Sequence, residues 1–139
     1  MELKVRTKEA ITKPEQIAEI FQAIQKAESE IDRMKERFWI VGMNTKNFIM
    51  YVELVSMGTL NASLVHPREV FAFAIKRGGI SGILAIHSHP SGDPEPSEDD
   101  ITVTKRLYDA GKILGIELLD HIIVTDGPAF VSLKARDKL

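Results

Sequence analysis

The chain has 139 residues, of which 44% are apolar, and this is enough for one domain to bury a hydrophobic core. Its 18 basic and 20 acidic residues give a formal net charge of -2, so no overall basic charge predicts a nucleic-acid or membrane partner. Cysteine is absent, which excludes disulfides, thiolate nucleophiles and metal sites with sulfur ligands. Any metal ion must therefore be held by His, Asp or Glu.

The amino-terminal segment MELKVRTKEAITKPEQ is charged and lacks the apolar stretch of a signal peptide. No continuous apolar run is long enough to span a bilayer. We therefore expect a soluble, cytoplasmic protein with no membrane partner. We also expect a single domain over residues 1–139, with a core at about 15–135.

The first predicted element is a helix that begins at Pro14. Apolar residues recur after it at helical spacing as far as Ile31, and the helix is expected to end before Phe38. Two strands follow, FWIVGMN and FIMYVELVS. A turn from Asn44 to Asn47 predicts that they form a hairpin.

Pro67 begins a second predicted helix, PREVFAFAIKRG, which ends at Gly78 and Gly79. The segment GILAIHSH starts as an unbroken apolar run and predicts a strand covered on both faces. SEDDITVTKRLYDAGKILG predicts a third helix that ends at Gly115, and ELLDHIIVT and AFVSLK predict two closing strands. This order of elements predicts an α/β domain with a mixed sheet.

Two histidines, His87 and His89, follow the buried strand at its carboxyl end, where ligands usually bind in open α/β sheets. Residues two apart on a strand face the same side, so both imidazoles can be presented to one point. Histidines at strand ends also cap or form hydrogen bonds. The pair alone therefore leaves both interpretations open.

The segment after these histidines, PSGDPEP, is rich in proline and turns the chain back toward the next helix. Ser97 is a natural N-cap, and the first helical turn contains Glu98, Asp99 and Asp100. Carboxylates at this position stabilise a helix by about 0.3 to 1 kcal/mol. Ser97 and Asp100 also have the spacing of a capping box, so simple capping explains the acidic cluster when it is considered alone.

Considered together, the two histidines and Asp100 form a three-ligand set that leaves a fourth position on zinc for water. Such an open site is typical of catalysis, because zinc lowers the pKa of bound water to about 7 and polarises a carbonyl oxygen. Glu53 interrupts the apolar strand FIMYVELV and is the candidate general base, since an unpaired buried carboxylate is costly. A solvated face of the sheet explains Glu53 equally well.

The arrangement of Glu53, the run from His87 to Pro90, Ser97 and Asp100 resembles the JAMM motif of the JAB/MPN metalloprotease family. The segments MGTLNASLVHPREVF, HSHPSGDPEPSEDD and LLDHIIVTDG resemble its bacterial RadC-like branch, formerly labelled a DNA repair protein. The resemblance covers about residues 15 to 135. It implies a RadC-like JAB/MPN fold, similar to the cytidine deaminase architecture, with helices flanking a mixed central sheet.

The resemblance also implies site residues and an activity. Zn²⁺ is expected on His87, His89 and Asp100, with Glu53 as general acid/base and Ser97 stabilising the oxyanion of a tetrahedral intermediate. The expected function is that of a JAMM-type, zinc-dependent hydrolase of peptide or isopeptide bonds, with a protein or peptide as substrate.

Two departures from the family pattern concern the partners. RadC-like proteins typically carry an amino-terminal helix-hairpin-helix region associated with DNA contact, whereas one helix is predicted here before the first strand. Family members that cleave ubiquitin carry insertions for which this chain has little room. The alternative function is a DNA-associated RadC-like binding module with a retained, non-proteolytic metal site. A nucleobase deaminase would need cysteine ligands, and exposed strand edges could pair into a homodimer.

Three further polar residues have simpler interpretations. His66 precedes Pro67 and is interpreted as a capping or surface residue. Asp120 and His121 face opposite sides of their predicted strand. Either one could orient a zinc-binding histidine through its free ring nitrogen, or be satisfied locally.

Overall fold

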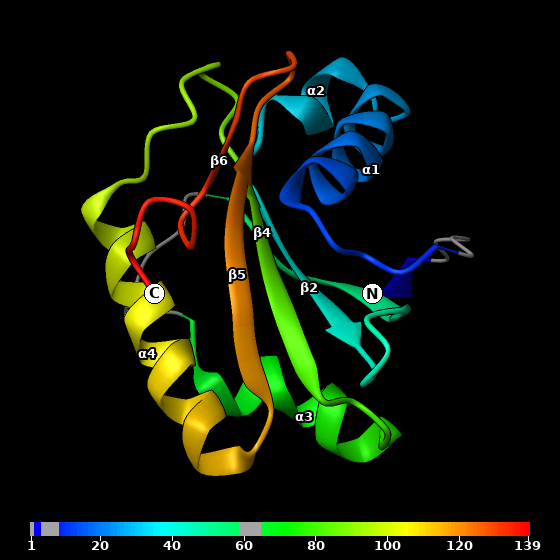
Figure 1. The fold of residues 1–139 in the computed structure, drawn as a ribbon. Helices are drawn as coiled ribbons and strands as arrows, with labels where there is room; N and C mark the ends of the chain where they lie inside the picture. The colour runs from blue at the N-terminus through cyan, green and yellow to red at the C-terminus, as the bar shows by residue number, and fades with distance from the viewer. Residues whose placement is uncertain (1, 4–8, 59–64) are drawn as a thin grey trace.

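The computed structural model of the chain describes residues 2–3, 9–58 and 65–139 (Figure 1). Its elements, in chain order, are β1 (Glu2–Leu3), α1 (Pro14–Lys26), α2 (Glu30–Arg33), β2 (Arg37–Met43), β3 (Ile49–Met57), α3 (Pro67–Arg77), β4 (Gly82–Ser88), α4 (Glu98–Leu114), β5 (Glu117–Val124) and β6 (Phe130–Ser132). Within the described residues, the strands form one six-stranded sheet with the order β1-β3-β2-β4-β5-β6. β4 and β5 pair in parallel and the other neighbours are antiparallel, so the predicted mixed α/β architecture is confirmed.

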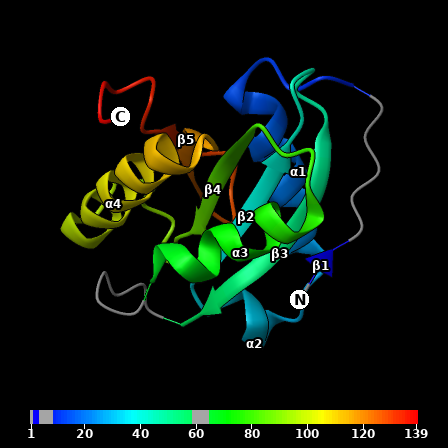
Figure 2. The same cartoon turned by 90° about the horizontal axis from the view of Figure 1, so that it is seen from below.

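Helices cover both faces of the sheet (Figure 2). α1 lies on one face, and α3 and α4 lie on the other. Two hydrophobic cores result. The core under α1 contains Ile17, Phe21, Trp39, Leu84 and Ile86, and the core under α3 and α4 contains Phe38, Ile40, Phe71, Ala85 and Leu107.

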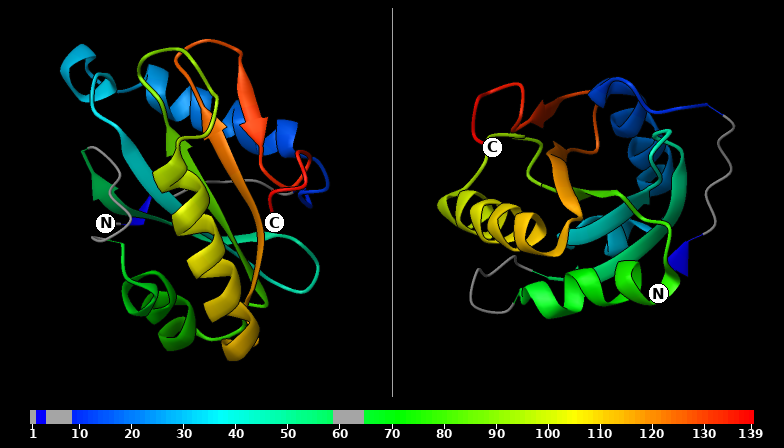
Figure 3. Two further views of the ribbon diagram at one scale, coloured as in Figure 1. Left: turned by 90° about the vertical axis from the view of Figure 1, so that its left-hand side faces the viewer. Right: turned by 60° about the horizontal axis from the view of Figure 1, so that its bottom comes forward.

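The alternation of side chains along β4 connects this layered architecture to the predicted site. Ala85 belongs to the core under α3 and α4, and Ile86 belongs to the core under α1. His87 therefore faces the α3 and α4 side. The segment after β4 carries the chain from the carboxyl end of this strand to the start of α4 (Figure 3).

The predicted first helix is two helices, so the prediction of one continuous helix is wrong. α1 ends at Lys26, and Ser29 begins α2 because its side chain accepts a hydrogen bond from the N–H of Asp32 at 3.2 Å. This new cap begins a separate helix, in which no residue is buried, so the apolar periodicity no longer marks a buried face. Ile31 is accordingly 71% exposed.

The other predicted elements are confirmed. In the hairpin turn, the side-chain oxygen of Asn44 accepts hydrogen bonds from the N–H groups of Lys46 and Phe48, both at 3.0 Å. α4 ends at Gly115, whose φ of 74° is in the left-handed region that glycine adopts most readily. The sequence did not predict β1. The middle of the segment MGTLNASLVHPREVF, residues 59–64, lies outside the described residues.

Among the described helices, none combines the length and the apolar character needed to cross a bilayer.

Candidate metal centre

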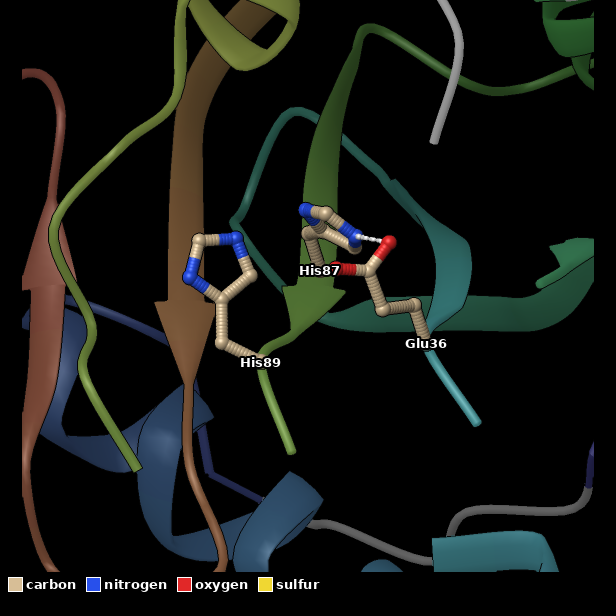
Figure 4. A group of neighbouring side chains, drawn as sticks. All are labelled: Glu36, His87 and His89. Atoms are coloured by element: carbon tan, nitrogen blue, oxygen red, sulfur yellow. Dashed lines mark ion pairs between the residues drawn. The ribbon is translucent and has the colours of Figure 1, made fainter. Parts of the chain in front are cut away.

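The two histidines lie where the sequence predicted them, at the carboxyl end of β4 (Figure 4). His87 is opposite Phe38 of β2 and is 2% exposed. The N–H of His89 donates to the carbonyl of Val124 at 2.8 Å, which continues the contact with β5 beyond the end of β4. The two imidazole centroids are 4.7 Å apart and the rings are nearly perpendicular. The pair therefore forms one polar group at the edge of the core.

Asp100 reaches this pair from the first turn of α4. The N–H of Ser97 donates to Asp100 Oδ2 at 2.8 Å, and the N–H of Asp100 donates to Ser97 Oγ at 3.1 Å. The same carboxylate contacts His87 Nδ1 through Oδ1 at 2.8 Å and His89 Nε2 through Oδ2 at 3.1 Å. The capping box is thus present, and it holds a fully buried carboxylate between the two imidazoles.

Both ring nitrogens of His89 face oxygen acceptors: Nδ1 faces the carbonyl of Asp93, and Nε2 faces the carboxylate of Asp100. His89 Nδ1 lies 3.0 Å from the carbonyl oxygen of Asp93, so Nδ1 carries the proton and donates it. In the neutral ring, Nε2 then has only a lone pair, directed at the Asp100 carboxylate. A proton or a cation must lie between these two atoms.

In the metal-free protein, the proton is favoured at this position. Burial opposes a charge on His89, but its hydrogen bonds to Asp100 and to the carbonyl of Asp93 raise its pKa overall. Burial also acts to raise the pKa of Asp100, but hydrogen bonds from His87 and His89 outweigh it and hold this pKa well below its usual range.

A divalent cation fits the same position. Two ligand atoms on a tetrahedral zinc ion are about 3.3 Å apart, because each bond is about 2.0 to 2.1 Å long. The 3.1 Å between His89 Nε2 and Asp100 Oδ2 is close to that separation. His87 Nε2 is buried and has no hydrogen-bond partner in the described part of the chain, so it offers another lone pair. Nitrogen and oxygen ligands of this kind suit zinc.

Glu36 also belongs to this group, and the sequence interpretation missed it. It lies in the link between α2 and β2, and its Oε2 is 3.7 Å from His87 Nε2 (Figure 4). Glu36, His87 and His89 offer ligand atoms that all lie within 4.8 Å of one another. The signal that could have found Glu36 is its place two residues before Phe38, which is paired with His87 in the sheet.

Glu53 lies on β3 and faces the same side of the sheet as His87. It is opposite Ile40 of β2, which in turn is opposite Ala85 of β4, so β2 separates it from the strand of the histidines. Two strand spacings separate the backbone of Glu53 from that of Ala85 by about 10 Å. Near Glu53, burial and the charge of this carboxylate raise the pKa of Tyr51. The structure therefore places Glu36, and not Glu53, among the converging ligand atoms.

His121 contributes to a second converging group, with His87 and Asp100. His121 lies on β5, opposite Ala85 of β4, and faces the same side of the sheet as His87. It is fully buried, and burial, with the nearby His87, lowers its pKa to about 3. Hence His121 is neutral at physiological pH. We call Glu36, His87, His89, Asp100 and His121 the histidine cluster.

The remaining predicted residues lie at the margin of the cluster or outside it. Ser97 is exposed at the start of α4, and its hydroxyl proton remains available for donation. His66 is the N-cap residue of α3 and belongs to neither converging group. A pocket of about 320 Å³ lies on the opposite face of the sheet, where Ile17, Asp120 and Lys134 help to line it, and none of its lining residues belongs to the cluster.

Comparisons with known proteins show the family of this chain. Residues 11–139 match the profile of the RadC-like JAB domain family. A UPF0758 protein of Alkaliphilus metalliredigens is 55% identical over 105 residues, which are 76% of this chain and 44% of that protein. A UPF0758 protein of Moorella thermoacetica is 56% identical over 105 residues, which are 76% of this chain and 45% of that protein.

A longer match is the UPF0758 protein of Shouchella clausii, which is 50% identical over 126 residues, or 91% of this chain and 52% of that protein. The chain thus spans about half the length of the curated relatives it matches. The names of these relatives state no activity. The match to the family profile covers nearly the whole chain, and the chain belongs to the RadC-like JAB domain family.

Proposed function

We propose that this domain is a zinc-dependent hydrolase of peptide or isopeptide bonds, of the JAMM type, in which His87, His89 and Asp100 hold the ion. The observation that carries the proposal is the buried Asp100 carboxylate, which contacts both imidazoles directly. The JAB family, which includes hydrolases, supports the same reaction class. The substrate expected from this chemistry is a protein or peptide.

A zinc ion bound by these residues would act as a Lewis acid on a substrate carbonyl and would lower the pKa of the attacking water. The residues of the chain supply the fixed geometry. Asp100 is held by the capping box with Ser97, and His89 is held by the carbonyl of Asp93. A site fixed in this way loses little free energy in ordering its ligands before the reaction.

A carboxylate must carry a proton from the water to the leaving amine, and two residues are candidates. The resemblance assigns this role to Glu53. Glu36 is supported by position, because its carboxylate lies 3.7 Å from His87 Nε2. With a side chain that is 29% exposed, Glu36 reaches both solvent and the cluster. We infer that Glu36 is the proton carrier, and Glu53 stays a prediction from the resemblance.

Ser97 is the proposed donor to the oxyanion of the tetrahedral intermediate. Its oxygen accepts the N–H of Asp100, so its own proton is free to point away from the helix toward a substrate. Donors of this kind stabilise the charge that develops on the carbonyl oxygen.

Metal analysis tests the ligands. The purified protein should bind about one zinc ion per chain, and His87→Ala and Asp100→Ala should both lose it. His66→Ala is the matched control, because His66 lies outside the cluster and its removal should leave the zinc content unchanged. Unchanged zinc in both ligand variants would refute the metal site.

Digestion of a peptide library by the zinc-loaded protein tests the activity and the two carboxylates. Glu36→Gln should keep zinc and reduce turnover at least about 100-fold, as loss of a general base does, whereas Glu53→Gln should retain most turnover. The reverse result would return the role to Glu53. Absence of cleavage together with salt-dependent DNA retention on filters would instead favour the DNA-binding alternative.

A further inference from the structure

We propose that His121 is a positioning residue: its Nε2 accepts the Nδ1–H of His87 when both Asp100 oxygens bind the metal ion, and so keeps His87 Nε2 directed at that ion. The inference rests on the proposed function, because it concerns the same metal centre. It adds a residue from β5 to a site otherwise built from β4, α4 and the link before β2.

Thr104 determines which nitrogen of His121 carries the proton. Thr104 Oγ1 donates to the backbone carbonyl of Asp100, four residues earlier on α4, at 2.6 Å. A hydroxyl has one proton, so the 2.6 Å contact between Thr104 Oγ1 and His121 Nδ1 must be donated by the imidazole. Neutral His121 therefore carries its proton on Nδ1, and its Nε2 is an acceptor.

This acceptor is buried, and it belongs to a residue of the second converging group. His121 is fully buried, and Nε2 has no hydrogen-bond partner among residues 9–58 and 65–139. One His121 nitrogen lies within 4.8 Å of a His87 nitrogen and of an Asp100 oxygen. The edge-to-face contact with Phe38, at 5.8 Å between centroids, holds the ring in this orientation. A buried acceptor of this kind is unfavourable unless a donor reaches it.

His87 supplies that donor when a metal ion binds. In the metal-free protein, His87 Nδ1 is satisfied by Asp100 Oδ1 at 2.8 Å. When both Asp100 oxygens bind the ion, the buried N–H of His87 loses this acceptor and needs another. Metal-binding histidines usually donate their second ring N–H to a fixed partner, which sets the tautomer and the ring orientation. For this hydrogen bond, His87 Nδ1 and His121 Nε2 must come to roughly 2.9 Å from each other.

Nitrogen NMR of the full chain tests the proposal without any substitution. In the metal-free protein, His121 should be the Nδ1-protonated tautomer. With cadmium as the probe for zinc, scalar coupling to the metal should appear on His87 and His89 but not on His121. The Nδ1–H of His87 should become protected from exchange and show coupling across a hydrogen bond to His121 Nε2.

The possible results separate the inference from the proposed function. Coupling of the metal to His121, or a His121 Nε2 resonance that does not change on metal binding to His87 and His89, would overturn the inference alone. If no metal binds these histidines, the proposed function and the inference fall together.

Two threonines of α4 provide a matched pair of variants. Thr102 makes the same helical hydrogen bond, to the carbonyl of Glu98 at 3.0 Å, but it is exposed to solvent. Thr104→Val should weaken zinc binding up to about 10-fold, the lower end of the loss for an outer partner, because Thr104 contacts His121 and not the side chain of a metal ligand. Thr102→Val should leave zinc binding unchanged. Equal zinc affinity in both variants would contradict the proposal.

Substitution of His121 adds a test by rescue. His121→Leu removes the acceptor and should lower zinc affinity to a similar extent, whereas His121→Gln supplies an amide oxygen and should recover part of it. If His121→Leu does not fold, the threonine pair and the NMR experiment still decide the question. Wild-type affinity in a folded His121→Leu protein would refute a positioning role.

Discussion

Two buried polar groups lie on opposite sides of β5, and they differ in how completely their hydrogen bonds are formed. On the α1 side, Asp120 Oδ1 accepts the N–H groups of His121 at 2.7 Å and Lys134 at 3.0 Å. Asp120 Oδ2 accepts the hydroxyl of Ser132 at 2.5 Å. This carboxylate therefore connects β5 to β6 and to the segment that follows it.

The histidine cluster on the α4 side is incomplete by comparison. His87 Nε2 and His121 Nε2 are both buried, and neither has a hydrogen-bond partner within the described part of the structure. His89 Nε2 faces a carboxylate oxygen. Buried polar groups are normally satisfied, so a group of lone pairs left open indicates a place for a proton or an ion. Asp120 and His121 are neighbours on one strand, but Asp120 belongs to a structural group and His121 belongs to a candidate binding site.

The largest expected difference between the two groups is in metal affinity. Asp100→Ala removes a carboxylate that contacts both imidazoles and should reduce zinc affinity by more than about 100-fold, beyond the loss typical of an outer partner. Asp120→Ala should bind zinc like the wild type, because Asp120 faces the other core. Calorimetric titration of both variants with zinc measures the difference. Equal losses of affinity would show that the two groups are not functionally distinct.

The next effect is on stability. Asp120→Ala leaves two backbone N–H groups and the Ser132 hydroxyl without their acceptor and should lower the free energy of unfolding by about 2 to 4 kcal/mol. Urea denaturation measures this change. The Ser132→Ala control removes one of these three hydrogen bonds and the one that the Ser132 hydroxyl accepts from the N–H of Ala135, and it should cost about 1 to 2 kcal/mol. A fully stable Asp120→Ala protein would mean that this carboxylate does not hold β6 in place.

The smallest effect is in the pH dependence of the metal-free protein. Burial lowers the pKa of His121 to about 3, below its value of about 6.5 in the unfolded chain. As the pH falls below 6.5, the unfolded state therefore binds a proton that the folded state does not, and stability is lost. His89, whose pKa is raised in the folded state, contributes stability that is fully present below 6.5 and is lost above it.

Urea denaturation at pH 6 and pH 5 measures how much His121 lowers the free energy of unfolding between these pH values. This contribution is at most about 1.4 kcal/mol per pH unit. His121→Gln removes the titrating group, so its loss of stability between these two pH values should be smaller than that of the wild type. An identical loss in both proteins would show that another group is responsible.

The elements with local signals were predicted well. Ser97 and Gly115 delimit α4 because a cap and a left-handed residue act within one helical turn. The prediction of one continuous first helix was wrong at Ser29, where a second cap outweighed the apolar periodicity. The structure also brought together His87, His89 and Asp100, as expected from a strand end and the helix that follows it.

The sequence by itself determined most of the elements and placed His87, His89 and Asp100 together, because caps, turns and alternation depend on near neighbours. The tertiary structure alone decided which other polar side chains lie beside them. Glu36 reaches the cluster because β2 pairs with β4 so that Phe38 is opposite His87, and His121 reaches it because β4 and β5 are parallel with Ala85 opposite His121. Such registers are set by the packing of two cores between segments that are far apart in the chain, and no local pattern contains that information.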